Sequence, residues 1–277
     1  MKTIIVPTDF SPVALNALNY AIDMAKSHDA AIILLNTYQA PVSYSDAPVS
    51  PVTVVSIDDI RESADQRLSD LKQDVLRMTN GTMKVYTESK LGNTVDVLED
   101  MCSSVRPFAV VMGSHGSTGI ERLIMGSTTL SVIRNLRHPV IVVPPGTVYK
   151  EIRKIGLACD FKDVAETIPA EYIRRIVKEF NAELHVLNVN ADRDNYNDNT
   201  PLESASLDSL LGDIKPNYYF LQRDDIVEAI NEFADTHSLD VVIVIPKKHN
   251  LLEKIFHKSH SKQLVTNAHI PILSIHE

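Results

Sequence analysis

The chain has 277 residues, 44% of them hydrophobic and 23% charged, which is the composition of a folded globular protein with about two domains. Its 27 Lys and Arg face 36 Asp and Glu, and the net charge of −9 argues against nucleic acid or anionic membranes as partners, because neutralising phosphates requires a basic surface. The two cysteines, Cys102 and Cys159, exclude a disulfide framework and a four-cysteine zinc site and are expected in the core.

The apolar segments are all short. The N-terminal run Ile4–Val6 is interrupted by Pro7, whereas a signal peptide needs a longer apolar core. The longest runs, such as Val241–Ile245, fall far below the roughly 18 residues that a membrane span requires. Because cysteines are also few, we expect a cytoplasmic protein without a membrane partner.

Short β-branched runs alternate along the chain with stretches of helical periodicity. Continuous Val and Ile runs bounded by Pro, Gly or Asp are typical of parallel strands that are buried on both faces. Strands that alternate with helices predict doubly wound α/β sheets. The expected strands are Thr3–Val6, Ala31–Leu35, Ala109–Met112, Val140–Val143, Ile155–Ala158, Leu184–Val189, Val241–Ile245 and Ile270–Ile275.

Apolar residues at helical spacing fill the stretches between these runs. The first helix is expected over Ala14–Ala25, with Ser11 as its cap and Pro12 in its first turn. A longer, charged helix is expected over Ile57–Met78. Two more helices of this half are expected around Val95–Met101 and over Thr128–Leu136.

The two halves of the sequence share short motifs in the same order. A strand end with an Asp-Phe pair opens each half, and a Pro followed by Val or Ile begins its last strand. We therefore expect two copies of one five-stranded α/β unit, as domains 1–146 and 147–277, with Pro144–Gly146 as the linker. The matching segments are Val6–Phe10 with Leu157–Phe161, Ile120–Ile124 with Leu252–Phe256, and His138–Ile141 with Ile270–Leu273.

The strongest candidate site is a glycine-rich segment that follows the strand Ala109–Met112 and precedes a helix. Glycine lets backbone N–H groups approach an anion, and a helix N-terminus adds partial positive charge. Neither GxxxxGK[ST] nor GxGxxG is present, which argues against a P-loop and a dinucleotide-binding fingerprint. Taken alone, such a cluster is more often a turn than a site. It consists of Gly113, Ser114, His115 and Gly116, followed after nine residues by Gly126, Ser127 and Thr128.

The spacing Gly113-x2-Gly116-x9-Gly126-Ser127 resembles the nucleotide-binding branch of the universal stress protein family. Val6–Ser11 and His138–Val140 add to the resemblance, which is strong over residues 2–144 and weak over 151–276. It implies two tandem doubly wound α/β domains, each a mainly parallel five-stranded sheet in the order 3-2-1-4-5, paired through their last strands. ATP, carried with Mg²⁺, is then expected across the carboxyl ends of strands 1 and 4, in agreement with the switch-point rule.

The resemblance also implies binding roles for individual residues. Asp9 is placed to accept from ribose hydroxyls or to hold a phosphate-bound metal, or else it caps the helix that starts near Ser11. Tyr38 matches a position that contacts the base, and packing over a strand end explains it nearly as well. His115 has no identifiable Ser or Asp partner, so we expect it to bind rather than to catalyse. The full set expected to bind the nucleotide is Pro7, Thr8, Asp9, Tyr38, Met112, Gly113, Ser114, His115, Gly116, Gly126, Ser127 and Thr128, with no catalytic residue and no metal ligated by the protein alone.

The second copy departs from this pattern. The three glycines fall opposite Ile245, Lys248 and Lys258, whose side chains fill the space of a phosphate, and Pro246 removes an N–H donor. We therefore expect the second domain to have lost this mode of ATP binding. Its basic stretch Lys247–Lys262 is interpreted as a solvated face, with an anionic ligand or an acidic partner as the alternative.

The sequence thus predicts a stress-response regulatory protein whose first domain binds ATP or another adenine nucleotide. Occupancy of that site would favour one conformation of a surface that an unidentified protein partner reads. Two chains can pair further as a homodimer. Two alternatives stay open, namely slow ATP hydrolysis through phosphate positioning alone and a ligand-free interaction scaffold. Enzyme activity is disfavoured because no catalytic base, arginine finger or acceptor-substrate motif is evident.

Overall fold

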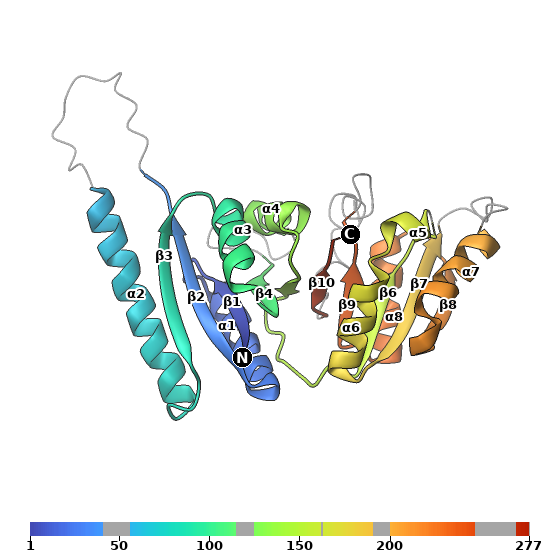
Figure 1. Ribbon diagram of the computed structural model, residues 1–277, viewed down its shortest axis with the longest axis horizontal. Helices are drawn as coiled ribbons and strands as arrows, with labels where there is room; N and C mark the ends of the chain where they lie inside the picture. Colours follow the sequence, from blue (N-terminus) through green and yellow to red (C-terminus); the bar gives the residue numbers. More distant parts are fainter. Residues whose placement is uncertain (41–55, 115–124, 162, 191–199, 247–269, 277) are drawn as a thin grey trace, which may run out of the picture.

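A computed structural model describes residues 1–40, 56–114, 125–161, 163–190, 200–246 and 270–276 of the chain. Its strands form one ten-stranded sheet in the order β3-β2-β1-β4-β5-β10-β9-β6-β7-β8. The first half of the chain occupies one side of the molecule and the second half the other, with β10 near the middle (Figure 1).

The first half builds a parallel unit in the predicted order 3-2-1-4-5. Each expected strand and helix of this half is present, and the second helix has the expected bounds. Ser11 is the N-cap of the first helix, and its Oγ accepts from the N–H of Ala14 at 3.2 Å. The elements are β1 (Lys2–Pro7), α1 (Pro12–His28), β2 (Ala30–Tyr38), α2 (Ile57–Met78), β3 (Val85–Leu91), α3 (Thr94–Val105), β4 (Ala109–Gly113), α4 (Ser127–Asn135) and β5 (Val140–Val143).

The second half repeats the same strand order, counted from its own first strand. The predicted fold class, two doubly wound parallel units in tandem, is therefore confirmed. The elements are β6 (Lys154–Ala158), α5 (Val164–Thr167), α6 (Ala170–Phe180), β7 (Glu183–Asn190), α7 (Thr200–Leu211), a 3₁₀ turn (Gly212–Ile214), β8 (Asn217–Gln222), α8 (Ile226–His237), β9 (Val241–Val244) and β10 (Ile272–Ser274).

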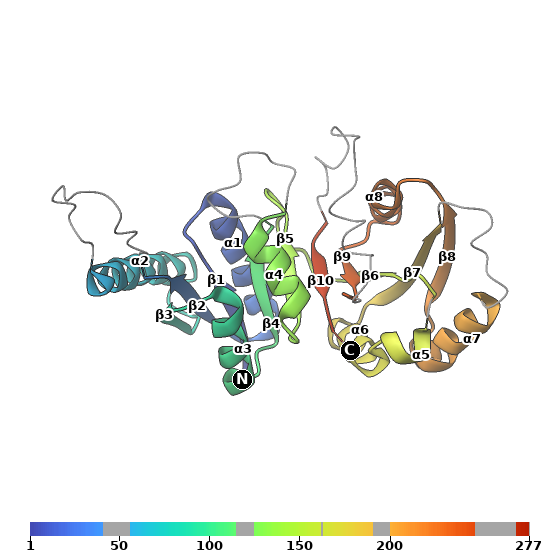
Figure 2. The ribbon, with the colours of Figure 1, turned by 90° about the horizontal axis from the view of Figure 1, so that it is seen from above.

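The last strands of the two halves pair with each other, as expected. Strands β5 and β10 are antiparallel, with Ile141 opposite Leu273 and Val140 opposite Ser274, and they lie side by side at the centre of the molecule (Figure 2). Every other strand pairing in the sheet is parallel. The tandem chain is thus an internal pseudo-dimer built on one continuous sheet.

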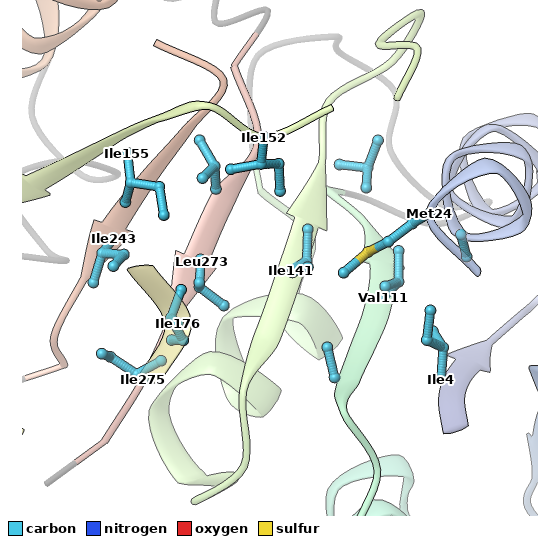
Figure 3. Packing of buried hydrophobic residues seen from close by; sticks show 14 of the residues in the cluster. Ile4, Met24, Val111, Ile141, Ile152, Ile155, Ile176, Ile243, Leu273 and Ile275 are labelled. Carbon is cyan, nitrogen blue, oxygen red and sulfur yellow. The ribbon is translucent and has the colours of Figure 1, made fainter. Parts of the chain in front are cut away.

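The apolar core runs across the junction between the halves. On the face covered by α1, α2, α6 and α7, one buried cluster includes Ile4, Val111 and Ile141 of the first half together with Leu273 and Ile243 of the second. These residues follow one another across the sheet (Figure 3). A second cluster lies under α3, α4 and α8 on the other face. Because burial of apolar area stabilises folded proteins, this continuity holds the two halves together.

Candidate functional site

The order of strands places a switch point between β1 and β4. These strands are neighbours, with Ile4 opposite Ala109 and Ile5 opposite Val110. From β1 the sheet continues to β2 on one side, whereas from β4 it continues to β5 on the other. The carboxyl ends of β1 and β4 therefore form a topological switch point, which is where open α/β sheets bind their ligands.

The loop after β1 is fixed by hydrogen bonds around Thr8. The Thr8 N–H donates to the carbonyl of Leu35 at 2.8 Å, and its own carbonyl accepts from Asn36 Nδ2 at 2.7 Å. The Thr8 Oγ1 accepts from the N–H of Phe10 at 3.0 Å, in a turn where Phe10 has a left-handed φ of 64°. Pro7 and Thr8 are buried. This loop is consequently a rigid platform at the strand end.

Asp9 projects from that platform and is exposed. Its Oδ1 accepts from the N–H of Ser11 at 3.0 Å, while Ser11 itself is the cap of α1. Asp9 therefore braces the turn before the cap and is not the N-cap. The carboxylate stays at the carboxyl edge of the sheet, in the turn that follows β1.

Gly113, the last residue of β4, is required by packing. A Cβ at this position would lie 2.8 Å from Val13 Cγ1 and 3.0 Å from the Val13 carbonyl oxygen. The first turn of α1 thus rests directly on the backbone of Gly113, and Thr129 Oγ1 donates to the Gly113 carbonyl at 3.0 Å. Met112, one residue earlier, is buried in the cluster under α3 and α4. Close approach of α1 accounts for this glycine without a ligand.

The two ends of the glycine-rich segment are held together. The Gly126 N–H donates to the Ser114 carbonyl at 2.8 Å, and the Ser114 N–H donates to the Val143 carbonyl at 3.2 Å. Gly126, Ser127 and Thr128 are thereby placed beside the ends of β4 and β5. His115 and Gly116 lie outside the described residues.

Helix α4 starts differently from the other helices of this half. Helices α1, α2 and α3 have Ser11, Ser56 and Asn93 at their N-caps, and each of these side chains accepts a backbone N–H. The N-cap of α4 is Gly126, which has no side chain, and no side chain of the described residues caps this helix start. Ser127 and Thr128, which follow it, are exposed. Uncapped N–H groups at a helix N-terminus are donors available to an anion.

The backbone carbonyl of Tyr38, a residue predicted to contact the base, already accepts a hydrogen bond. Tyr38 ends β2, is half-buried, and its carbonyl accepts from the N–H of Gly92 at 2.9 Å. The contact with a base that the sequence implied for it stays a prediction.

The sequence analysis did not identify two residues that hold this edge of the sheet. Asn36, which holds Thr8, is a buried amide in an otherwise apolar strand, and that contrast was a usable signal. Arg67 of α2 lies over the Phe10 ring, 3.9 Å from its centroid, and nothing local in the sequence indicates this contact.

The second half repeats the platform with one substitution. The Cys159 N–H donates to the Leu187 carbonyl at 2.9 Å, and its carbonyl accepts from Asn188 Nδ2 at 2.9 Å. The N–H of Phe161, with a φ of 48°, points to Cys159 Sγ at 3.4 Å. A thiol thus takes the place of the Thr8 hydroxyl while the backbone pattern is retained.

The helix after this second platform is broken. Where α1 is one helix of 17 residues, the second half has the four-residue α5 and then α6, which starts after Pro169. Ile245 stands where the first half has Gly113 and is buried, which excludes the same close approach of the helix. Lys248 and Lys258, and the rest of the basic stretch Lys247–Lys262, lie outside the described residues.

The remaining candidate groups are the two cysteines and the side chains that could ligate a metal ion. Burial, together with Glu99, raises the pKa of the Cys102 thiol to about 12. Both cysteines are buried, and among the described residues neither forms a disulfide. Within the described ranges, no three His, Cys, Asp or Glu side chains are grouped to hold a metal ion. In the same ranges, no helix is long and apolar enough to cross a membrane.

Comparison with known proteins defines the class. The model of the universal stress protein family matches the chain twice, over residues 1–144 and 151–276. The chain therefore belongs to the universal stress protein family, in its tandem two-domain form.

Individual relatives agree with this assignment. A universal stress protein of Methanocaldococcus jannaschii is 30% identical over 143 residues, which are 51% of this chain and 81% of that protein. A crystal structure of a universal stress protein from Archaeoglobus fulgidus has a TM-score of 0.66 at 18% identity and covers 99% of this chain and 96% of its own. A putative universal stress protein from Pseudomonas aeruginosa has a TM-score of 0.56 at 12% identity, with 100% and 93% covered. The structures share the fold of both domains.

Proposed function

We propose that the first domain binds ATP, or another adenine nucleotide, at the carboxyl ends of β1 and β4. The observation that carries the proposal is the start of α4, which lies beside the switch point and has glycine as its N-cap, with no capping side chain among the described residues. The other three helices of this domain are capped by their own side chains. Membership of the family supports the same site.

In this proposal, different residues at this edge bind the phosphates, the ribose and the base. The N–H groups of Ser127 and Thr128, with their hydroxyls, bind phosphate oxygens, helped by the partial positive charge of the helix end. Asp9 accepts from ribose hydroxyls or from water on a Mg²⁺ ion that the phosphates carry. Tyr38 and the rigid strand end at Thr8 border the base. The chain supplies phosphate binding without a lysine.

The proposed regulation depends on whether the nucleotide site is occupied. In this proposal the nucleotide favours one arrangement of the loops at the carboxyl edge, and a protein partner distinguishes the two arrangements. The second domain does not bind ATP in this way, because Ile245 fills the position of Gly113 and its first helix is broken. The expected stoichiometry is one nucleotide per chain.

Calorimetric titration with ATP and Mg²⁺ tests the site. Gly126 has a φ of −61° and a ψ of 147°, which any residue adopts, so Gly126→Val blocks the phosphates without straining the backbone. Gly212→Ala is the matched control, because a Cβ there meets nothing within 4 Å. We expect one ATP per chain in the wild type and the control, and no binding heat in Gly126→Val. Undiminished binding in Gly126→Val would contradict the proposal.

A further inference from the structure

A pocket of about 470 Å³ lies where the two domains meet. Arg137 and Pro139, which precede β5, line one side, and Ile275 and His276, which follow β10, line another. The start of α6 supplies the rest of the wall. Because β4 and β5 are parallel, the pocket lies at the opposite edge of the sheet from the ends of β1 and β4. It is therefore separate from the proposed nucleotide site.

The pocket depends on the helix break of the second domain. Helix α6 begins at Ala170, after Pro169, instead of continuing from α5. Both of these residues line the pocket. In the first domain the corresponding helix, α1, is uninterrupted. The cavity is therefore associated with the helix break, which is found only in the second copy. The end of β10 meets this start of α6 beside the C-terminus (Figure 2).

Two arginines from different domains border the same cavity. Arg137 and Arg175 are exposed, and neither forms an ion pair within the part of the chain that the structure describes. By contrast, Arg153 and Arg223 each pair with a carboxylate at 2.6 Å and 3.3 Å. The Arg175 guanidinium lies 4.3 Å from the centroid of the Tyr172 ring, which restrains it at the pocket wall. Arg175 also hydrogen-bonds the Tyr172 side chain, but among the described residues neither guanidinium has a carboxylate partner, so both can bind an anion.

The wall is held in place from the first domain. His276 Nε2 lies 2.8 Å from the carbonyl oxygen of Ile133, and because a carbonyl only accepts, the ring nitrogen donates. This bond ties the chain after β10 to Ile133 in the last turn of α4, four residues before Arg137. Ile275 is buried. Packed elements therefore hold the backbone around the cavity in place.

The lining defines the chemistry of the ligand. Two guanidinium groups match the charge of about −1.5 to −2 on a phosphate monoester and donate to it in pairs. Pro139, Pro169 and the Tyr172 ring offer apolar contact to a carbon skeleton, and Glu171, also in the lining, accepts from a hydroxyl. The volume falls in the range of about 300–1,000 Å³ typical of small-molecule sites.

We propose that this interdomain pocket binds a small hydroxylated phosphate ester, of the class of a sugar phosphate. The phosphate lies between Arg137 and Arg175, and a hydroxyl donates to Glu171. The bound ester bridges the two domains, since one arginine comes from each.

Calorimetric titration of the full chain with ribose 5-phosphate tests this assignment. We expect saturable binding that weakens about 10- to 100-fold in Arg137→Ala and in Arg175→Ala, because each removes charge-assisted hydrogen bonds. Arg175→Lys keeps the positive charge but loses the paired N–H donors of the guanidinium, and we expect an intermediate affinity. Arg77→Ala, an exposed arginine of α2, is the matched control and should bind as the wild type does. Gly126→Val should also bind normally, which separates this site from the nucleotide site.

Four outcomes would overturn the assignment. The first two are the absence of saturable binding at millimolar ribose 5-phosphate and equal affinity of the wild type and both alanine variants. The third is loss of ribose 5-phosphate binding in Gly126→Val but not in the arginine variants. The fourth is equal affinity for inorganic phosphate and the ester. The last result would leave the hydroxyl and apolar contacts without a role.

Discussion

Replacing Gly113 by alanine tests the contact that joins α1 to the end of β4. The added Cβ would lie 2.8 Å from Val13 Cγ1, 3.0 Å from the Val13 carbonyl oxygen and 3.1 Å from the Val13 carbonyl carbon. Two of these three atoms belong to the backbone, so a change of side-chain rotamer cannot relieve the clash. The start of α1 has to move away from the sheet.

The size of the effect follows from two opposing terms. Overpacking of a buried site costs about 1–3 kcal/mol, and the lower entropy of alanine in the unfolded chain returns about 0.4–1 kcal/mol. We expect Gly113→Ala to lower the free energy of unfolding by about 1–2 kcal/mol. For a chain of this size that corresponds to a Tm lower by roughly 2–8 °C.

Thermal unfolding followed by circular dichroism measures this loss, with Gly212→Ala as the control. Nothing lies within 4 Å of a Cβ at Gly212, so the control should keep the wild-type Tm. In a Val13→Ala background, which removes the Cγ1 contact only, the loss from Gly113→Ala should shrink without vanishing. A Gly113→Ala variant as stable as the wild type would refute the packing explanation of this glycine.

Three further predictions concern buried polar groups. Asn36→Ala leaves the Thr8 carbonyl without its donor at 2.7 Å, and thermal unfolding should show a loss of about 1–3 kcal/mol, whereas an unchanged Tm would contradict the role of Asn36. Both cysteines are buried and the Cys102 pKa is about 12, so a thiol reagent at pH 8 should label neither cysteine in the folded protein and both after denaturation. Rapid labelling of the native chain would contradict this prediction. Burial lowers the pKa of His185, so the unfolded chain binds its proton more readily and stability should fall as the pH drops through about 6.5. His185→Phe should flatten that decrease in urea unfolding at pH 5.5 and 7.5, and an unchanged slope would exclude His185 as its source.

The central strands could be predicted from sequence because they are buried on both faces. Continuous Val and Ile runs, such as Val140–Val143, have that pattern and form strands with nearly the expected bounds. The edge strands β3 and β8 were missed. Their sequences, VYTESKL and NYYFLQ, mix polar and apolar residues because each has a neighbour on one side only and is partly exposed. Edge strands therefore lack the continuous apolar runs that mark strands buried on both faces.

The strand and helix that flank the glycine-rich segment were predictable, whereas its contacts were less so. The segment follows β4 and precedes α4, as the sequence indicated. The reason for Gly113 was not visible, because Val13 approaches it from a helix one hundred residues away in sequence. The helix break at Pro169 was also missed, although a proline is a local signal for the start or end of a helix.

The nucleotide content of the purified protein tests the central claim most directly. Denaturing the protein, separating the supernatant by chromatography and titrating the empty fraction with ATP gives the number of sites per chain. The account predicts one adenine nucleotide per chain in the wild type and none in Gly126→Val. Two nucleotides per chain would show that the second domain also binds, and no nucleotide with no binding at millimolar ATP would contradict the proposed function and favour a ligand-free interaction scaffold.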